Sequence, residues 1–232
     1  PDLFKPRPRT ERTIDIVMLA NFGTYKRHFE LFKALRKMPE TISVTLVGQP
    51  HGERTAEVLR AEAALYDVAH RITIRERVSN EELTEILCQA RVSLIFSLRE
   101  GSCVAVVESL FADTPVGLFE DAAIGSRVFI DEHTGRFLSH HNLAAELIDF
   151  LDHASHYHPR EWALDHQLDC YGSTQKLNEF LRNYACAHEE PWTRDIFPHH
   201  WRPDPVLCRE EHRQLVAAET DYLRERYGLI IG

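Results

Sequence analysis

The chain has 232 residues, 44% hydrophobic and 27% charged, which is a globular composition and excludes a disordered or collagen-like protein. Its 27 Lys and Arg residues against 36 Asp and Glu residues give a net charge of −9. This sign argues against a protein whose whole surface binds nucleic acid. Residues 1–40 nevertheless hold nine basic and five acidic side chains. This basic region indicates either a small anionic ligand or, more commonly, a solvated helix face.

The lack of a membrane-spanning run or leader and the cysteine spacing favour a cytoplasmic protein. No apolar run approaches the roughly 20 residues that span a bilayer, and no basic-then-apolar leader opens the sequence. The five cysteines are scattered and never form a CxxC pair, which argues against a disulfide framework or a zinc ribbon. The Pro- and Arg-rich residues 1–12 resemble an interdomain linker, so we expect a fragment of a larger protein.

Short apolar runs alternate with stretches of helical periodicity, which is the pattern of a parallel sheet with helices on both faces. The expected strands are 14–20, 42–48, 71–74, 91–96, 115–118 and 136–138. The expected helices are 25–38, 54–66, 80–89, 103–112 and 142–153. Ser79 and Glu82 form a capping box at the third helix, and Asn142 is the expected N-cap of the fifth. The sequence therefore predicts an α/β, Rossmann-like domain over residues 13–155.

Strand signals end after about residue 155. A helix is expected over 172–186, followed by an irregular connection rich in Pro, His and Trp and by one amphipathic helix over 206–227. A segment of this kind seldom forms a core of its own. We expect residues 156–232 to form a helical extension packed on the α/β domain, or on a missing neighbour.

Two loops that follow expected strands carry candidate binding residues, because ligands of open parallel sheets bind at the carboxyl ends of the strands. In the first loop, Gly23 allows a tight turn, and Lys26 and Arg27 stand at a helix start. Cations are unfavourable there unless an anion lies between them and the helix. Two solvated surface cations are the alternative.

The second loop, residues 99–103, leads into a helix that contains Glu108. Glu100 and Glu108 are separated by roughly 9–12 Å along the helix axis, about the reach of an extended phosphosugar. Gly101 lacks the Cβ that would block a ligand, and the N–H groups of residues 102–104 are expected to be free for a phosphate or a sugar hydroxyl. Glu108 could instead be an ion-paired core residue.

The segment EGSCVAVVE, followed by SLFADTPVGL, resembles the EGxGxxxxEAMAxGxPVV signature of retaining GT-B glycosyltransferases, the superfamily that includes glycogen synthase and sucrose synthase. Further segments are similar to the family in the same order: PDLFKP, YKRHFELFKAL, TLVGQP, ITIRERVSNEELTEIL and IDEHTGRFL. The resemblance covers about residues 2–150. It implies a Rossmann-like sheet that forms the C-terminal, donor-binding half of a GT-B fold.

The resemblance also implies a role for each candidate residue. Lys26, with Arg27, would hold the diphosphate of a nucleotide sugar, and Glu100 would contact the transferred sugar. Glu108 would accept hydrogen bonds from the ribose hydroxyls. The remaining expected donor-binding residues are Asn21 and Gly23 near the diphosphate, Gly101, Ser102 and Cys103 beside the sugar, Val104 near the ribose, and Arg75 to Val78 at the base.

Three positions depart from the family pattern. Asn21 stands where the family usually has an arginine, Glu76 replaces a small residue near the base, and Cys103 replaces a glycine. Each change could weaken donor binding. The resemblance implies no metal or other cofactor. In agreement, the sequence has no DxD motif, and its 14 histidines lack a spacing such as HExxH.

The resemblance implies transfer of a sugar from a nucleoside diphosphate to an acceptor hydroxyl, with retention at the anomeric carbon. Its partners would be a nucleotide sugar and a missing N-terminal acceptor domain, without nucleic acid. Any membrane association would be peripheral and through the missing domain, and the chain alone would be inactive. Two alternatives stay open: a degenerate, non-catalytic binding or scaffold module, and a sugar-nucleotide epimerase of GT-B architecture.

Overall fold

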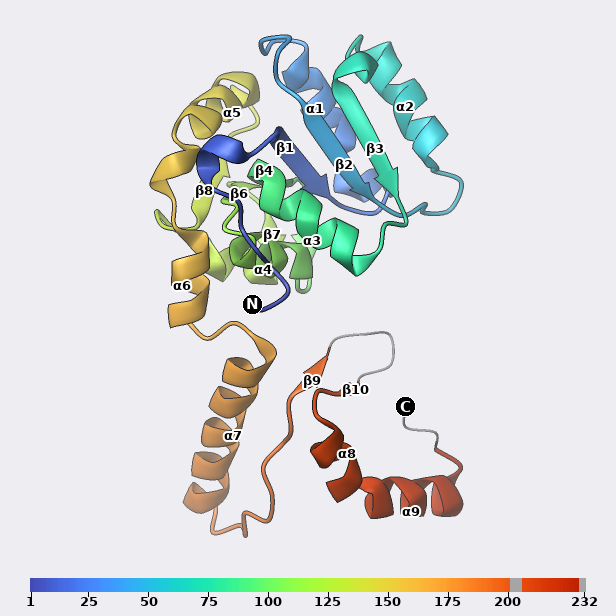
Figure 1. Ribbon diagram of the computed structural model, residues 1–232, viewed down its shortest axis with the longest axis vertical. Coiled ribbons are helices and arrows are strands. Elements are labelled where there is room, and N and C mark those ends of the chain that lie inside the picture. Colours follow the sequence, from blue (N-terminus) through green and yellow to red (C-terminus); the bar gives the residue numbers. More distant parts are fainter. Residues whose placement is uncertain (201–205, 230–232) are drawn as a thin grey trace. The chain divides into compact units, whose positions relative to one another are not determined.

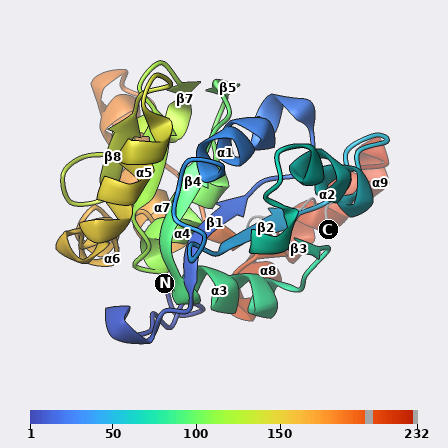
Figure 2. The same ribbon diagram turned by 90° about the horizontal axis from the view of Figure 1, so that it is seen from above.

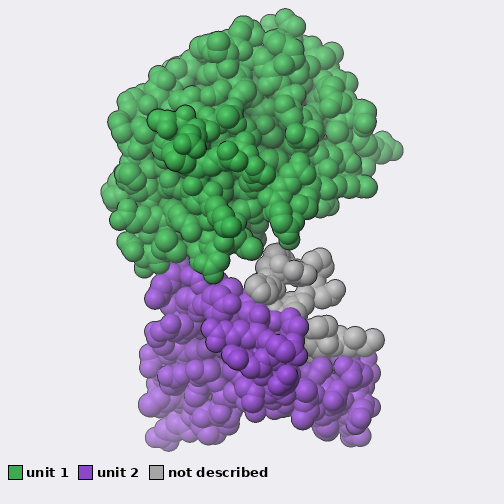
Figure 3. Space-filling model, viewed as in Figure 1, with its two compact units in different colours: residues 1–166 green, residues 167–232 purple. Residues whose placement is uncertain are grey.

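The computed structural model describes residues 1–200 and 206–229. The chain divides into two compact units, Pro1–His166 and Gln167–Gly232 (Figure 3). Among the described residues, no helix is long and apolar enough to cross a bilayer.

Unit 1 is built on a six-stranded sheet of order β3-β2-β1-β4-β6-β8, in which all neighbours are parallel (Figure 1). Its strands are β1 Ile14–Leu19, β2 Val44–Gly48, β3 Ile72–Glu76, β4 Ala90–Ile95, β6 Val116–Phe119 and β8 Gly135–Leu138. A separate parallel pair joins β5 Arg99–Glu100 to β7 Ala123–Ile124. The six expected strands are confirmed, as is the α/β, Rossmann-like fold.

Helices cover both faces of the sheet (Figure 2). They are α1 His28–Leu35, α2 Ala56–Leu65, α3 Asn80–Gln89, α4 Val104–Phe111, α5 Leu143–Asp152 and α6 Pro159–Asp165. Helix α1 contacts α2 and α5, and α3 contacts α4. The Ser79 side chain accepts a hydrogen bond from the Glu82 N–H at the start of α3, as its capping pattern predicts. Asn142 precedes α5 but makes no such bond, and α6 was not expected from the sequence.

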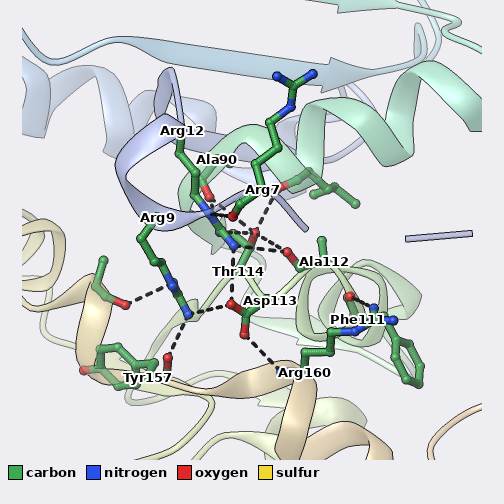
Figure 4. A network of polar contacts seen from close by, with 12 residues as sticks. Arg7, Arg9, Arg12, Ala90, Phe111, Ala112, Asp113, Thr114, Tyr157 and Arg160 are labelled. Carbon is green, nitrogen blue, oxygen red and sulfur yellow. Dashed lines mark hydrogen bonds and ion pairs between the residues drawn. The ribbon is translucent and has the colours of Figure 1, made fainter. Parts of the chain in front are cut away.

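The segment before β1 is packed on unit 1 through a buried arginine (Figure 4). The Arg12 side chain is 0% exposed, and its Nη1 donates to the Ala90 carbonyl at 2.7 Å and to Thr114 Oγ1 at 3.1 Å. The Asp113 carboxylate, just after α4, pairs with Arg9 at 3.0 Å and with Arg12 at 3.4 Å. Burial lowers the pKa of Arg12 to about 10, so it stays charged near neutral pH. These ion pairs and hydrogen bonds therefore hold the N-terminal segment against the end of α4.

Unit 2 contains α7 Cys170–Ala187, the antiparallel pair β9 His199–His200 and β10 Val206–Leu207, and the helices α8 Glu210–Leu215 and α9 Ala217–Tyr227. The expectation of one amphipathic helix over 206–227 is wrong. The segment starts as a strand, and its helical part is divided at Val216. No residue of α8 or α9 is buried, so no continuous packed face holds the two pieces in one helix.

Candidate functional site

A cleft of about 450 Å³ lies at the carboxyl ends of β1, β2 and β3 and the start of α4. Strands β2 and β3 follow β1 on one side of it, whereas β4, β6 and β8 lie on the other side, so the strand order reverses between β1 and β4. Ligands of such sheets bind near the point of reversal. Eight of the expected site residues line the cleft: Asn21, Lys26, Val78, Glu100, Ser102, Cys103, Val104 and Glu108. Gly23, Arg27, Arg75 and Gly101 do not line it.

An ion pair joins the two loops that the sequence singled out. Lys26 Nζ lies 2.6 Å from Glu100 Oε1, and their side chains are only 12% and 15% exposed. Lys26 belongs to a 3₁₀ turn over Thr24–Lys26, whereas Glu100 ends β5. The Lys26 ammonium also lies 5.2 Å from the centroid of the Tyr25 ring. An anion that enters the cleft must therefore share this ammonium with Glu100.

Arg27, unlike Lys26, does not line the cleft. Its backbone has a left-handed conformation with φ 58°, and its guanidinium pairs with Glu30 at 2.7 Å. The same guanidinium lies 5.7 Å from the Phe119 ring centroid. The adjacent Lys26 and Arg27 thus separate, and Lys26 alone of the two faces the cleft.

Asn21 and Gly23 form the rest of this loop. The Tyr25 hydroxyl donates to Asn21 Oδ1 at 3.0 Å, so the amide that replaces the family's arginine is held by a neighbouring side chain. A Cβ on Gly23 would lie 2.4 Å from the Tyr25 ring. Gly23 is therefore required for the packing of Tyr25 rather than for contact with the cleft.

The start of α4 differs from expectation at Cys103. Its N–H donates to Ser126 Oγ at 2.9 Å and is not free for a ligand. The first N–H groups of a helix lack intrahelical acceptors, and in α4 these belong to Val104 and Ala105, which both line the cleft. They give this wall a positive electrostatic character. Ser126 has no local sequence signal, because it lies 23 positions from Cys103 in the chain.

Glycines support the cleft at positions other than Gly101. A Cβ on Gly101 would meet no atom within 4 Å, so the loop there has open space. A Cβ on Gly125 would lie 2.1 Å from the Gly101 carbonyl oxygen, and one on Gly48 would lie 1.9 Å from the Ala20 carbonyl oxygen. Gly125 and Gly48 are therefore needed for close backbone approach. Gly48 falls in the TLVGQP segment, but Gly125 had no recognised signal.

Glu108 lies inside α4 as a largely buried carboxylate without a hydrogen-bond or ion-pair partner among the described residues. Burial raises its pKa. The alternative of an ion-paired core residue predicts a cationic partner, and the described part of the chain provides none. An acceptor that faces a cleft and lacks a partner is suited to bind hydroxyl groups.

The loop after β3 supplies Arg77, which was expected only as part of the base-binding segment. Its backbone has φ 54°, an uncommon conformation for a residue other than glycine, and its N–H donates to the Gly48 carbonyl at 3.0 Å. Its side chain is 71% exposed, and its nearest carboxylate, that of Glu76, is 3.7 Å away. Arg77 and Lys26 are the two basic residues that line the cleft among the described residues.

Glu76, which replaces a small residue of the family pattern, does not obstruct the cleft. Glu76 Oε2 accepts a hydrogen bond from the Ala56 N–H at 3.3 Å, at the first residue of α2. A carboxylate at a helix N-terminus is stabilised by the unpaired N–H groups and the helix dipole. Glu76 thus has a structural role beside the cleft and does not line it.

His28, the first residue of α1, is 1% exposed, and neither ring nitrogen has a hydrogen-bond partner in the part of the chain that the structure describes. Burial, assisted by Arg54 and Lys26, lowers its pKa from 6.5 to about 4. The unfolded chain binds this proton below about pH 6.5 and the folded chain only below about pH 4. The free energy of unfolding should therefore fall by about 3 kcal/mol as the pH falls between these values.

Urea unfolding at several pH values tests this prediction. A His28→Leu variant should lose the His28 part of the pH dependence, whereas His141→Leu, at an exposed position, should retain it. Parallel pH profiles for the wild type and His28→Leu would contradict the prediction.

No group of three or more His, Cys, Asp and Glu residues is placed to hold a metal ion within residues 1–200 and 206–229. Burial raises the pKa of Cys103 to about 11, so this thiol at the cleft is protonated near neutral pH. The charged side chains that line the cleft are Lys26, Arg77, Glu100 and Glu108, and the start of α4 adds its first N–H groups.

The fold is similar to that of solved glycosyltransferase structures. Sucrose-phosphate synthase from Thermosynechococcus elongatus matches with a TM-score of 0.64 and 22% identity, over 80% of this chain and 51% of that protein. HepE from Anabaena matches with a TM-score of 0.66 and 16% identity, over 78% and 54%. The catalytic domain of the cholesterol-α-glucosyltransferase from Helicobacter pylori matches with a TM-score of 0.54 and 19% identity, over 66% and 96%.

These TM-scores show a shared fold, the Rossmann-like half of a GT-B architecture, and the chain spans about half the length of sucrose-phosphate synthase and HepE. No curated protein matches the sequence. The family model described as "Glycosyl transferases group 1" matches residues 1–161, which include every residue of the cleft. The chain therefore belongs to the group 1 family of glycosyltransferases.

Proposed function

We propose that this chain is the donor-binding half of a retaining glycosyltransferase. It binds a nucleoside diphosphate sugar, whose sugar moves to an acceptor hydroxyl with retention at the anomeric carbon. The observation that carries the proposal is one cleft that holds the Lys26–Glu100 ion pair, the start of α4 and the unpartnered Glu108 carboxylate. A cation with helix N–H groups suits a diphosphate, and an unpartnered carboxylate suits ribose hydroxyls.

In the proposed reaction, the bond between the anomeric carbon and the diphosphate oxygen breaks, and a bond to the acceptor oxygen forms on the same face of the sugar. The departing diphosphate oxygen develops a negative charge and then takes up the proton that the acceptor hydroxyl loses. Lys26 and the first N–H groups of α4 stabilise that charge, so we propose that transfer needs no metal. Glu100, released from part of its contact with Lys26, accepts hydrogen bonds from sugar hydroxyls.

Half of the active site is proposed to lie outside this chain. The chain matches about half of HepE, a protein crystallised with UDP and glucose. We propose that acceptor groups lie on an N-terminal domain, through which any peripheral membrane association would occur, and that the present chain alone does not catalyse transfer. UDP is the first nucleotide to test because HepE binds it.

Calorimetric titration of UDP, GDP and ADP into the chain tests the proposal. One nucleotide should bind with clear preference, raise the melting temperature, and be displaced by the corresponding nucleotide sugar. Absence of binding by all three nucleotides would contradict a donor site.

Arg77 is expected to provide the second cation for the diphosphate, in place of the arginine that Asn21 replaces. Lys26 is already paired with Glu100, whereas the nearest carboxylate to Arg77 is 3.7 Å away. Arg77→Gln should weaken UDP binding about tenfold and leave uridine binding nearly unchanged, since one charge-assisted contact is lost. Calorimetry with UDP, UMP and uridine measures this difference.

Arg75→Gln is the matched control, because Arg75 is exposed on the same strand end and does not line the cleft. It should leave UDP affinity within about twofold, as expected for a distant exposed charge. An equal loss of uridine and UDP binding in Arg77→Gln would instead place the arginine against the base.

Glu108→Gln should weaken UDP binding while leaving the folded protein equally or more stable. The amide keeps the shape but loses the charge and one acceptor oxygen, and it removes a carboxylate whose charge burial disfavours. Calorimetry and thermal melts measure the two effects, with Glu132→Gln at an exposed position outside the cleft as the control. A lower melting temperature with unchanged UDP affinity would contradict the ribose role.

A non-catalytic nucleotide-binding module is the second candidate, and Asn21 favours it. Its side chain is a neutral amide whose oxygen accepts from the Tyr25 hydroxyl, so this position provides no positive charge to a leaving diphosphate. Both candidates predict nucleotide binding, and they differ in whether transfer follows when the chain is joined to an acceptor domain. Release of UDP from a bound UDP-sugar in the joined protein would support the enzyme.

A further inference from the structure

We propose that Cys170 and Cys208 form a reversible disulfide site in unit 2, which takes a low-molecular-weight disulfide as its oxidant. The two Sγ atoms lie 3.8 Å apart, although the residues are 38 positions apart in the sequence. Cysteine spacing alone argued against a disulfide framework, and folding of unit 2 creates this pair.

Hydrogen bonds anchor the backbone near both cysteines. Cys170 begins α7 directly after Asp169, whose carboxylate accepts from the N–H groups of Tyr171 at 2.8 Å and Gly172 at 3.1 Å. The Cys208 N–H donates to the Pro198 carbonyl at 3.0 Å. Next to the cysteines, the Arg209 guanidinium lies 5.6 Å from the Tyr171 ring centroid. The contact between the thiols is thus supported by bonds and packing on both sides.

The geometry permits a bond with little movement. A disulfide has an S–S distance of about 2.05 Å, so the sulfurs, now 3.8 Å apart, must approach by about 1.8 Å. Both cysteines are partly exposed and accessible to a small reagent. Among the described residues this is the one pair of thiols in contact; Cys88 and Cys103 are buried, and Cys186 is exposed on α7.

The proposed chemistry is thiol–disulfide exchange with a reagent such as oxidised glutathione. One cysteine thiolate attacks the reagent, forms a mixed disulfide and releases one glutathione thiolate. The second cysteine thiolate attacks the mixed disulfide and releases the second glutathione. Two protein thiols are oxidised, one reagent disulfide is reduced to two thiols, and the two protons pass to the released thiolates. Burial and the neighbouring Cys208 raise the pKa of Cys170, so exchange should accelerate as the pH rises.

The disulfide would link the start of α7 to the segment between β10 and α8. Leu207, beside Cys208, and Phe197 line a mainly apolar cavity of about 650 Å³ within unit 2. A covalent link at this place restrains one wall of that cavity. Oxidation would therefore reduce the mobility of this part of unit 2.

The test exposes the full chain to oxidised glutathione at pH 8, followed by alkylation and peptide mapping by mass spectrometry. The Cys170–Cys208 cross-link should exceed any cross-link through Cys186 by about tenfold or more, because the paired thiols have a high effective concentration. Dithiothreitol should reverse it. The oxidised protein should also be cut more slowly by trypsin after Lys176, Arg182 and Arg194 than the reduced protein.

Matched serine variants complete the test. Cys186→Ser should behave as the wild type, whereas Cys170→Ser and Cys208→Ser should lose the cross-link and keep a glutathione adduct on the remaining partner. Absence of the cross-link in the wild type, or equal amounts of cross-link through Cys186, would overturn the proposal.

Discussion

Replacing Arg12 with alanine should lower the free energy of unfolding of unit 1 by about 3 kcal/mol or more. The guanidinium is 0% exposed, and its removal leaves the Ala90 carbonyl and Thr114 without a cationic donor and creates a cavity. Asp113 would keep its ion pair with Arg9 at 3.0 Å, so most of the loss comes from the hydrogen bonds and the cavity. Urea unfolding followed by circular dichroism measures this effect.

Arg7→Ala is the control for this prediction. Arg7 pairs with Glu85 at 3.0 Å, but the side chains are 47% and 60% exposed. An exposed pair of this kind contributes about 0–1 kcal/mol. Equal losses of stability in the two variants would contradict the inference that the buried Arg12 network anchors the N-terminal segment to α4.

Replacing Lys26 with methionine should weaken UDP binding at least about tenfold, since a charge-assisted contact contributes roughly 1.5–3 kcal/mol. The loss has two parts, because Lys26 attracts the diphosphate and also neutralises Glu100 at 2.6 Å. Without Lys26, the Glu100 carboxylate would repel the incoming phosphates. Calorimetry at two salt concentrations should also show a weaker salt dependence in the variant.

Two further variants test the interpretation of Lys26. Lys33→Met changes an exposed cation on α1 that pairs with Glu30 at 3.8 Å, and it should leave UDP affinity nearly unchanged. Glu100→Gln frees Lys26 and should raise UDP affinity, while weakening the preference for a UDP-sugar. Unchanged UDP affinity in Lys26→Met would remove the diphosphate role from this residue.

The sequence by itself determined the framework of unit 1 and the position of its cleft. Buried strands are encoded by short apolar runs such as 42–48, and helix α3 by the capping pattern at Ser79, so local patterns were sufficient for them. The glutamates of the EGSCVAVVE segment lie at the carboxyl end of the sheet because their loop and helix follow β4. Connectivity therefore places them without knowledge of side-chain packing.

Only the tertiary structure decided which neighbouring residues face the cleft. Lys26 and Arg27 are adjacent, yet a left-handed backbone at Arg27 directs its guanidinium to Glu30. Arg77 lines the cleft and Arg75 does not. One-residue differences of this kind depend on backbone dihedral angles in loops, which apolar periodicity does not encode.

Contacts between distant segments also could not be predicted from the sequence. Ser126 accepts a hydrogen bond from the Cys103 N–H, Arg12 donates one to the Ala90 carbonyl, and the Cys170 thiol contacts that of Cys208. The residues of each pair are more than 20 positions apart. The tail expected as one helix over 206–227 became a strand and two short helices without buried residues. Local propensity is weak where no packed face selects one conformation, so tertiary contacts decided both the partners and the breaks.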